Sequence, residues 1–97
     1  MVTAFILMTL ERQAINDTAQ QLQEIKGISE VYSVSGKYDL VAVARVPTAD
    51  DLADLVTGRM PKLEGIRSTE TMLAFRSYSR HDLDSMFSVG MEEEGRG

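Results

Sequence analysis

The sequence of 97 residues contains no cysteine, no tryptophan and a single histidine. Without cysteine, disulfide bonds, thiolate metal sites and cysteine nucleophiles are excluded, which fits a cytoplasmic protein. No apolar run approaches the roughly 20 residues that a membrane span needs, and residues 1–5 lack the basic start of a signal peptide. We therefore expect no contact with a membrane.

Positive charge is also scarce, with ten Lys and Arg against 15 Asp and Glu. Residues 1–80 carry nine basic and ten acidic side chains, and residues 81–97 carry one basic and five acidic ones. The body is therefore nearly neutral, and the acidic excess lies near the C-terminus. Binding to nucleic acid depends on clustered Lys and Arg that neutralise phosphates, so we expect no direct contact with DNA or RNA.

Hydrophobic patterns predict one α+β domain over residues 1–80. Alternating apolar residues predict strands, and an apolar stripe at helical spacing predicts each helix. Thr48 is expected to cap the second helix and Pro61 to end it. Residues 81–97 are expected to form a short amphipathic helix and an acidic, disordered tail. The predicted strands span residues 2–10, 28–35, 39–46 and 68–76, and the predicted helices span residues 12–26 and 48–60.

The two halves of this pattern repeat each other at the joint between helix and strand. Ile25-Lys26-Gly27-Ile28 in the first half matches Leu63-Glu64-Gly65-Ile66 in the second. Two right-handed β-α-β units interleaved in this way form a ferredoxin-like βαββαβ sandwich, in which the first and third strands are central. Those two strands are the ones with apolar residues on both faces.

The helices can cover only one face of such a sheet. The other face would then expose more than the few hundred Å² of apolar surface that is usual on a monomer. We therefore expect a two-fold homodimer with the sheets packed face to face, as in a dimeric α/β barrel. The sequence leaves open which residues line this face: part of Phe5, Leu7, Val41, Val43, Leu73 and Phe75, or their alternates.

The sequence offers little for catalysis or metal binding. Its single histidine, His81, lies beyond the last predicted strand, and no Ser-His-Asp or Glu-x-x-His arrangement can be formed. Asp50, Asp51 and Asp54 fit the solvated first turn of a helix better than a metal site. We predict no catalytic residue, no metal and no cofactor.

Two polar motifs are candidates for ligand binding. Gly36-Lys37-Tyr38-Asp39 can be a plain hairpin turn, in which Gly supplies a positive φ. Its backbone N–H groups can also hold a carboxylate while Asp39 holds an ammonium group, which together suit a zwitterion. Ser68-Thr69-Glu70-Thr71-Met72 can be the solvent-facing part of a strand, or a row of hydrogen-bonding groups along a pocket.

Both motifs resemble those of a known family. Residues 34–43 (VSGKYDLVAV) resemble the V-x-G-x-x-D-hydrophobic hairpin of the Lrp/AsnC effector domain, also called the RAM domain. Residues 63–71 (LEGIRSTET) resemble the hydrophobic-x-G-V-x-x-T-x-T start of that family's last strand, and the order of elements agrees over residues 2–75. The complete regulators of this family are feast/famine transcription factors with an N-terminal helix-turn-helix domain.

The resemblance implies a function. The family's effector domains dimerise through their sheets and assemble into larger rings, often octamers, and amino acids or related small molecules bind between dimers. Because the first predicted strand starts at Val2, we expect a stand-alone effector domain, which would co-assemble with a full-length regulator and not bind DNA itself. The residues implied in effector binding are Gly36, Lys37, Tyr38, Asp39, Leu40, Ser68, Thr69, Thr71 and Met72.

Two other functions remain open. Dimeric α+β barrel enzymes, such as small monooxygenases and isomerases, share this layout, and a fold does not fix a function. Such enzymes usually place a His, Asn, Trp or Arg inside the barrel, whereas His81 lies beyond the fourth strand. The other alternative is a purely structural assembly domain, which only a ligand screen separates from a sensing domain.

Overall fold

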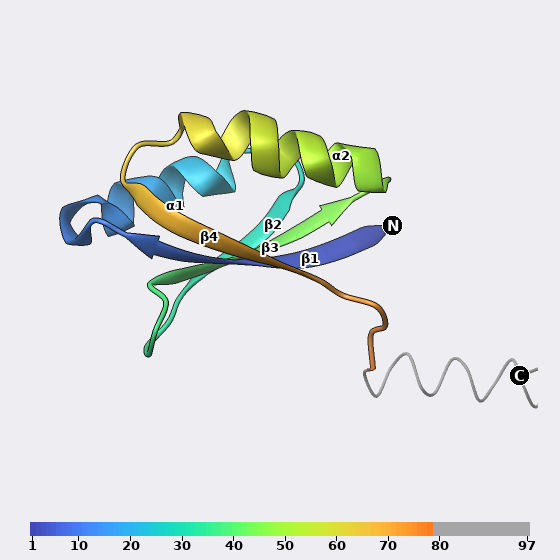
Figure 1. The fold of residues 1–97 in the computed structure, drawn as a ribbon, viewed down its shortest axis with the longest axis horizontal. Coiled ribbons are helices and arrows are strands. Elements are labelled where there is room, and N and C mark those ends of the chain that lie inside the picture. The colour runs from blue at the N-terminus through green and yellow to red at the C-terminus, as the bar shows by residue number, and fades with distance from the viewer. Residues whose placement is uncertain (79–97) are drawn as a thin grey trace, which may run out of the picture.

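The computed structural model describes residues 1–78, so His81 and the helix and tail predicted for residues 81–97 lie outside the described residues. In the described part, a sheet carries both helices on one face (Figure 1). Short turns, η1 (Arg12–Ala14), η2 (Leu55–Arg59) and η3 (Met60–Lys62), extend the helices. The strands are β1 (Val2–Leu10), β2 (Ile28–Ser33), β3 (Leu40–Val46) and β4 (Ile66–Leu73), and the helices are α1 (Ile15–Gln23) and α2 (Ala49–Asp54).

The strands lie in the order β2-β3-β1-β4, and every neighbouring pair is antiparallel. β1 and β3 are therefore central, as predicted from their two-sided apolar pattern. Together with the two crossover helices, this topology confirms the ferredoxin-like βαββαβ sandwich. β1 pairs with β3 on one side and with β4 on the other, so it is the strand to which most of the sheet is bonded.

The core lies between the helices and one face of the central strands. Because side chains alternate along a strand, every second residue of β1 and β3 points to this face. Leu22 of α1 and Leu55 of η2 cover them from the helical layer and are fully buried. No element within residues 1–78 covers the other face of the sheet (Figure 1). The buried strand residues on the helical face are Ala4, Ile6, Met8 and Leu10 of β1 and Leu40, Ala42, Ala44 and Val46 of β3.

The helices are less regular than the periodicity predicts. Thr48 caps α2 as expected, because its Oγ1 accepts a hydrogen bond from the N–H of Asp51 at 3.1 Å. α2 then passes into the π-helical turn η2 and the 3-10 turn η3, so Pro61 lies inside the last helical turn and does not end the helix. A proline is tolerated early in a helical turn, where its missing N–H has no partner to lose. In the first half, the predicted helix 12–26 begins with η1, and its α-helical part ends at Gln23.

The last strand also differs from its predicted limits. β4 begins at Ile66, two residues before the predicted start, and ends at Leu73 instead of residue 76. β4 ends there because its pairing partner, β1, is close to its own first residue at that point. The N–H of Ala74 already reaches the carbonyl of Thr3, at 2.9 Å.

Backbone hydrogen bonds at the two joint glycines connect the halves of the fold. The carbonyl of Gly27 accepts the N–H of Arg45 at the end of β3, and the carbonyl of Gly65 accepts the N–H of Glu11 just after β1, both at 2.8 Å. Each joint is thus bonded to the first strand of the other half. Gly65 has a φ of 93°, and a Cβ there would lie 2.5 Å from the Cβ of Ala14, so the position requires glycine.

We predict that Gly65→Ala destabilises the fold by roughly 1–3 kcal/mol, because alanine is strained at positive φ and its methyl would overlap Ala14. Gly58→Ala is the matched control, since a Cβ there meets nothing within 4 Å, and it should be neutral or stabilise by up to about 1 kcal/mol. Urea unfolding measures both. Equal stabilities of the two variants would contradict the packing described at this joint.

Candidate functional site

The hairpin between β2 and β3 is held by its own backbone. The N–H of Val34 donates to the carbonyl of Asp39 at 3.1 Å, which closes the loop and ends β2 two residues before its predicted limit. Gly36 lies at the tip with a φ of 108°, so the positive φ expected there is confirmed. The Nζ of Lys37 lies 5.7 Å from the centre of the Tyr38 ring, within the range of a cation–π contact.

Asp39 fastens the hairpin to the end of β1. Its Oδ2 accepts the N–H of Leu10, and its own N–H donates to the carbonyl of Met8, both at 2.8 Å. A carboxylate that accepts a backbone N–H makes a charge-assisted bond, so one oxygen of Asp39 has a structural role that the sequence did not reveal. The neighbouring side chain of Leu40 is buried in the core. An ammonium partner for Asp39 stays a prediction.

Tyr38 brings the two motifs together. Its hydroxyl donates to a carboxylate oxygen of Glu70 on β4, so the hairpin and the last strand meet across β1. This bond to a carboxylate is the main reason why the pKa of Tyr38 is raised above its ordinary value, and partial loss of solvent adds to it. Tyr38 is therefore held as a neutral donor. Tyr38 was among the residues expected from the sequence, whereas Glu70 lay within the second candidate motif but was not singled out.

The candidate residues of β4 do not form one row. Since side chains alternate along a strand, Thr69 and Thr71 point to the helical side of the sheet, whereas Ser68 and Met72 point to the uncovered side with Glu70. The hydroxyls of Ser68 and Thr9 lie 2.6 Å apart on that side. The register that fixes these faces pairs Met8 with Thr69, Ile6 with Thr71, Thr9 with Ser68 and Phe5 with Met72.

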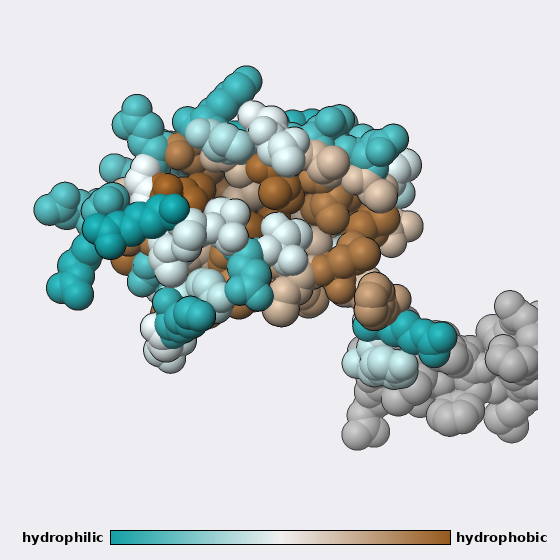
Figure 2. All heavy atoms as spheres, in the orientation of Figure 1, coloured by the Kyte–Doolittle hydropathy of each residue, from teal (hydrophilic) through white to brown (hydrophobic). Residues whose placement is uncertain are grey.

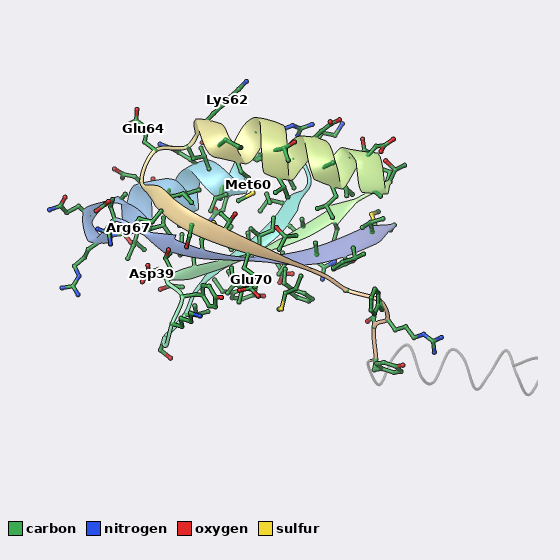
Figure 3. All side chains as sticks on the ribbon, viewed as in Figure 1. Asp39, Met60, Lys62, Glu64, Arg67 and Glu70 are labelled. Atoms are coloured by element: carbon green, nitrogen blue, oxygen red, sulfur yellow. The ribbon has the colours of Figure 1, made fainter. Side chains whose placement is uncertain are left out.

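A β-bulge sets Arg67 apart from the rest of β4. Thr9 pairs with Ser68 and Leu10 pairs with Ile66, so Arg67 has no partner on β1. Bulges of this kind redirect a side chain. Figure 3 places Arg67 at the same end of the sheet as Asp39, with Glu70 farther along β4.

The guanidinium of Arg67 grips the carboxylate of Glu11 with two bonds, Nε to Oε1 at 3.0 Å and Nη2 to Oε2 at 2.9 Å. These hydrogen bonds and the charge of Arg67 lower the pKa of Glu11. The bond to Glu11 raises the pKa of Arg67, and the negative charge of Asp39 adds to this rise. Two carboxylates and one guanidinium therefore share this end of the sheet. Glu11 and Arg67 were not expected from the sequence, because only the bulge turns Arg67 toward Glu11.

A groove of about 320 Å³ runs between η3 and the start of β4, beside Arg67. Figure 2 shows apolar residues at the surface between the helical layer and β4. The groove can therefore accept a small molecule with an apolar part and a polar end, since ligand sites combine an apolar lining with a few polar groups. Its lining includes Val56, Met60, Leu63 and Ile66, with Arg67 and Thr69.

The uncovered face of the sheet is apolar at its centre. The pairing register settles which alternating set lies there: Phe5, Leu7, Val41 and Val43, with Met72. Leu73 pairs with Ala4 and so belongs to the helical side, contrary to one of the sets expected from the sequence. Phe75 lies beyond the end of β4, with 91% of its surface exposed.

A polar cluster borders this apolar centre on the β2 side. Arg45 Nη1 lies 3.0 Å from Glu30 Oε1, and the hydroxyl of Tyr32 donates to the other oxygen of Glu30. The bond from Tyr32, then that from Arg45, lowers the pKa of Glu30, while the same carboxylate raises the pKa of Tyr32. The uncovered face thus has an apolar centre and a polar rim, the usual anatomy of a protein interface.

Among residues 1–78, no group of three or more His, Asp or Glu is arranged to hold a metal ion. None of the helices described is long and apolar enough to cross a membrane. His81, the histidine weighed in the enzyme alternative, lies outside the described residues.

Comparison with known proteins gives a consistent result. The model of the Lrp/AsnC ligand-binding domain matches residues 3–83. An HTH-type transcriptional regulator of Pyrococcus horikoshii is 30% identical over 76 residues, which cover 75% of this chain and 51% of the relative. This chain thus spans about half the length of the curated relatives it matches.

Solved structures of related proteins have a similar fold. The protein TTHA0845 of Thermus thermophilus is 42% identical, with a TM-score of 0.77 over 82% of this chain and 100% of its own. A transcriptional regulator of Neisseria meningitidis, solved as a complex with L-methionine, shares the fold with a TM-score of 0.73 at 14% identity, over 81% of this chain and 53% of its own. The chain therefore belongs to the Lrp/AsnC family, and residues 3–83 are its ligand-binding domain.

Proposed function

We propose that this domain senses a small amphoteric effector, an amino acid or a close relative, and assembles with other copies of itself, in the manner of Lrp/AsnC regulators. The observation that carries the proposal is the meeting of the two family motifs at one end of the sheet. There the hairpin is bonded to β1 through Asp39 and to β4 through Tyr38 and Glu70.

The charges at this end suit a zwitterion. Arg67 can pair with an α-carboxylate in the same two-bond geometry that it uses with Glu11, and Asp39 or Glu11 can pair with the ammonium group. The groove beside Arg67 offers an apolar wall for a side chain. The neisserial relative, a complex with L-methionine, supports an amino acid as the ligand class. Of the residues expected from the sequence, Ser68 and Thr69 line this groove, and Gly36 and Lys37 lie in the adjoining hairpin.

We predict that at least one amino acid raises the melting temperature of the domain, and that Asp39→Asn weakens its binding roughly tenfold or more. A hydrogen bond to a charged group contributes about 1.5–3 kcal/mol. Asparagine removes the charge but can still accept the N–H of Leu10, so the fold should be kept. Thermal-shift screening followed by calorimetry makes the measurement.

The control for this variant is Asp54→Asn, at the exposed end of α2, which should bind like the parent chain. No response to any amino acid would favour a purely structural assembly domain, and equal binding by the two variants would contradict the role proposed for Asp39.

The apolar centre of the uncovered sheet face supports a homodimer with the sheets packed face to face. A stable interface buries about 800 Å² on each partner, and burial of apolar surface at roughly 25 cal/mol per Å² supplies its driving force. Larger rings, up to an octamer, would form from such dimers, with the effector held between them. Phe5 lies at the middle of the face, paired with Val43 and Met72.

Phe5→Glu is expected to shift the protein from dimer to monomer, because it places a charge where the partner's apolar sheet would lie. Ala53→Glu, on the exposed side of α2, should leave the mass unchanged. Sedimentation at micromolar concentration distinguishes the two states. A parent chain that is a well-folded monomer at that concentration would refute the proposed dimer.

In the proposed role, the domain acts in the cytoplasm as a partner of a full-length Lrp/AsnC regulator and does not itself touch DNA. The nearly neutral charge of residues 1–80 supports this, since it provides no basic stripe for phosphates. The curated relatives named as transcriptional regulators support a regulatory, non-enzymatic role. Co-assembly would allow the domain to adjust the regulator's response through shared sheet faces.

A further inference from the structure

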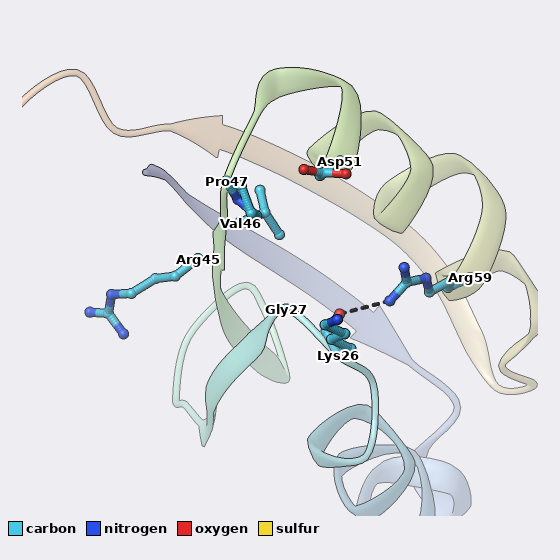
Figure 4. Close-up of a pocket in the computed structure, with 7 residues that line it drawn as sticks. All are labelled: Lys26, Gly27, Arg45, Val46, Pro47, Asp51 and Arg59. Carbon is cyan, nitrogen blue, oxygen red and sulfur yellow. Dashed lines mark hydrogen bonds between the residues drawn. The ribbon is translucent and has the colours of Figure 1, made fainter.

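A second cleft, of about 350 Å³, lies where α2 and η2 pass over the joint between α1 and β2 (Figure 4). It shares no lining residue with the groove beside Arg67. Val46 of β3 lines the cleft, whereas Leu40, six residues earlier, adjoins the hairpin. At about 3.3 Å per strand residue, this end of β3 lies roughly 20 Å from the hairpin, whereas Arg59 directly precedes Met60, which lines the groove beside Arg67. None of the residues implied in effector binding lines this cleft.

The charged side chains at the cleft are mostly positive. Lys26 and Arg59 line it, with Asp51 as the acidic member. Arg45 contributes its backbone and stem, but its guanidinium points away in Figure 4 and pairs with Glu30 at 3.0 Å.

The position of Arg59 depends on an uncommon helical turn. It is the last residue of the π-helical turn η2, a conformation that is rare and frequently found at functional sites. Its Nη1 donates to the carbonyl of Lys26 at 2.9 Å, as Figure 4 shows. That bond uses one of five N–H donors on a planar fork whose geometry matches carboxylate and phosphate oxygens.

The floor of the cleft is rigid backbone. The carbonyl of Gly27 is bonded to the N–H of Arg45. A Cβ at Gly27 would lie 2.9 Å from Cγ1 of Val46, so glycine keeps the joint close to β3. The bond between Arg59 and Lys26 has a structural explanation, because it holds the helical layer against the joint. That role does not explain why two basic residues, Lys26 and Arg59, line the same opening.

We propose that this cleft binds a small anion with at least two negative charges, a dicarboxylate or a phosphate group. The guanidinium of Arg59 supplies directed donors, and Lys26 supplies a second positive charge. The negative charge of Asp51 repels such an anion and so weakens its binding. The cleft is a second site, distinct in its lining residues from the groove beside Arg67.

The test is a chemical-shift titration of the ¹⁵N-labelled full chain with inorganic phosphate and, separately, with succinate, at constant ionic strength. We expect saturable shifts at the amides of Gly27 and Arg59 and at the Nε of Arg59. Saturation by phosphate alone identifies a phosphate site, and saturation by succinate alone identifies a dicarboxylate site. A matched series with sodium chloride gives the response to salt.

Four variants make the test specific. Lys26→Gln should weaken binding on the order of fivefold, as expected for losing one charge pair at about 4 Å in solvent, and Asp51→Asn should strengthen it. Lys62→Gln, an exposed lysine outside the cleft, should change nothing, and Asp39→Asn should leave this binding intact whether or not the effector proposal holds. Equal binding by the Lys26 and Lys62 variants, or shifts that do not saturate with either anion, would overturn the proposal.

Discussion

β1 and β3 carry apolar side chains on both faces, and the helices described can cover only one of these faces. That imbalance organises the rest of the molecule. The covered face becomes the core, closed by residues such as Leu22 and Leu55. The uncovered face, centred on Phe5 and Val41, is an exposed apolar surface of the kind that a partner usually covers. The polar and charged side chains that could bind ligands lie at the edges of the sheet: at the hairpin, at the bulged start of β4 and at the joints between helix and strand.

Much of the fold could be predicted from the sequence because it is encoded in repeated local patterns. The two-sided apolar pattern identified the central strands, and the matching joints at Gly27 and Gly65 revealed the repeat. The ends of elements were less predictable. The last strand stops at Leu73 because its neighbour runs out, and no pattern within the strand itself contains that information.

The candidate site could be predicted only in part, for a related reason. Local motifs identified the hairpin and the hydroxyl-rich strand, and the structure brings them together through Tyr38. The division of that strand between two faces depends on pairing with β1, which fixes where Thr69 points. The roles of Arg67 and Glu11 depend on a bulge in the same pairing, so a sequence without a register cannot reveal them.

The exchange of partners between the two halves has a consequence for folding. β2 is bonded to β3 and β4 to β1, so each half of the repeat completes its sheet only with a strand from the other. Contacts such as Thr9 with Ser68 join residues 59 positions apart. The entropy of closing such long loops is lost before the stabilising contacts form, which slows folding. The same arrangement disfavours a stable half-folded state. The domain should therefore fold and unfold as one cooperative unit, with neither repeat surviving alone.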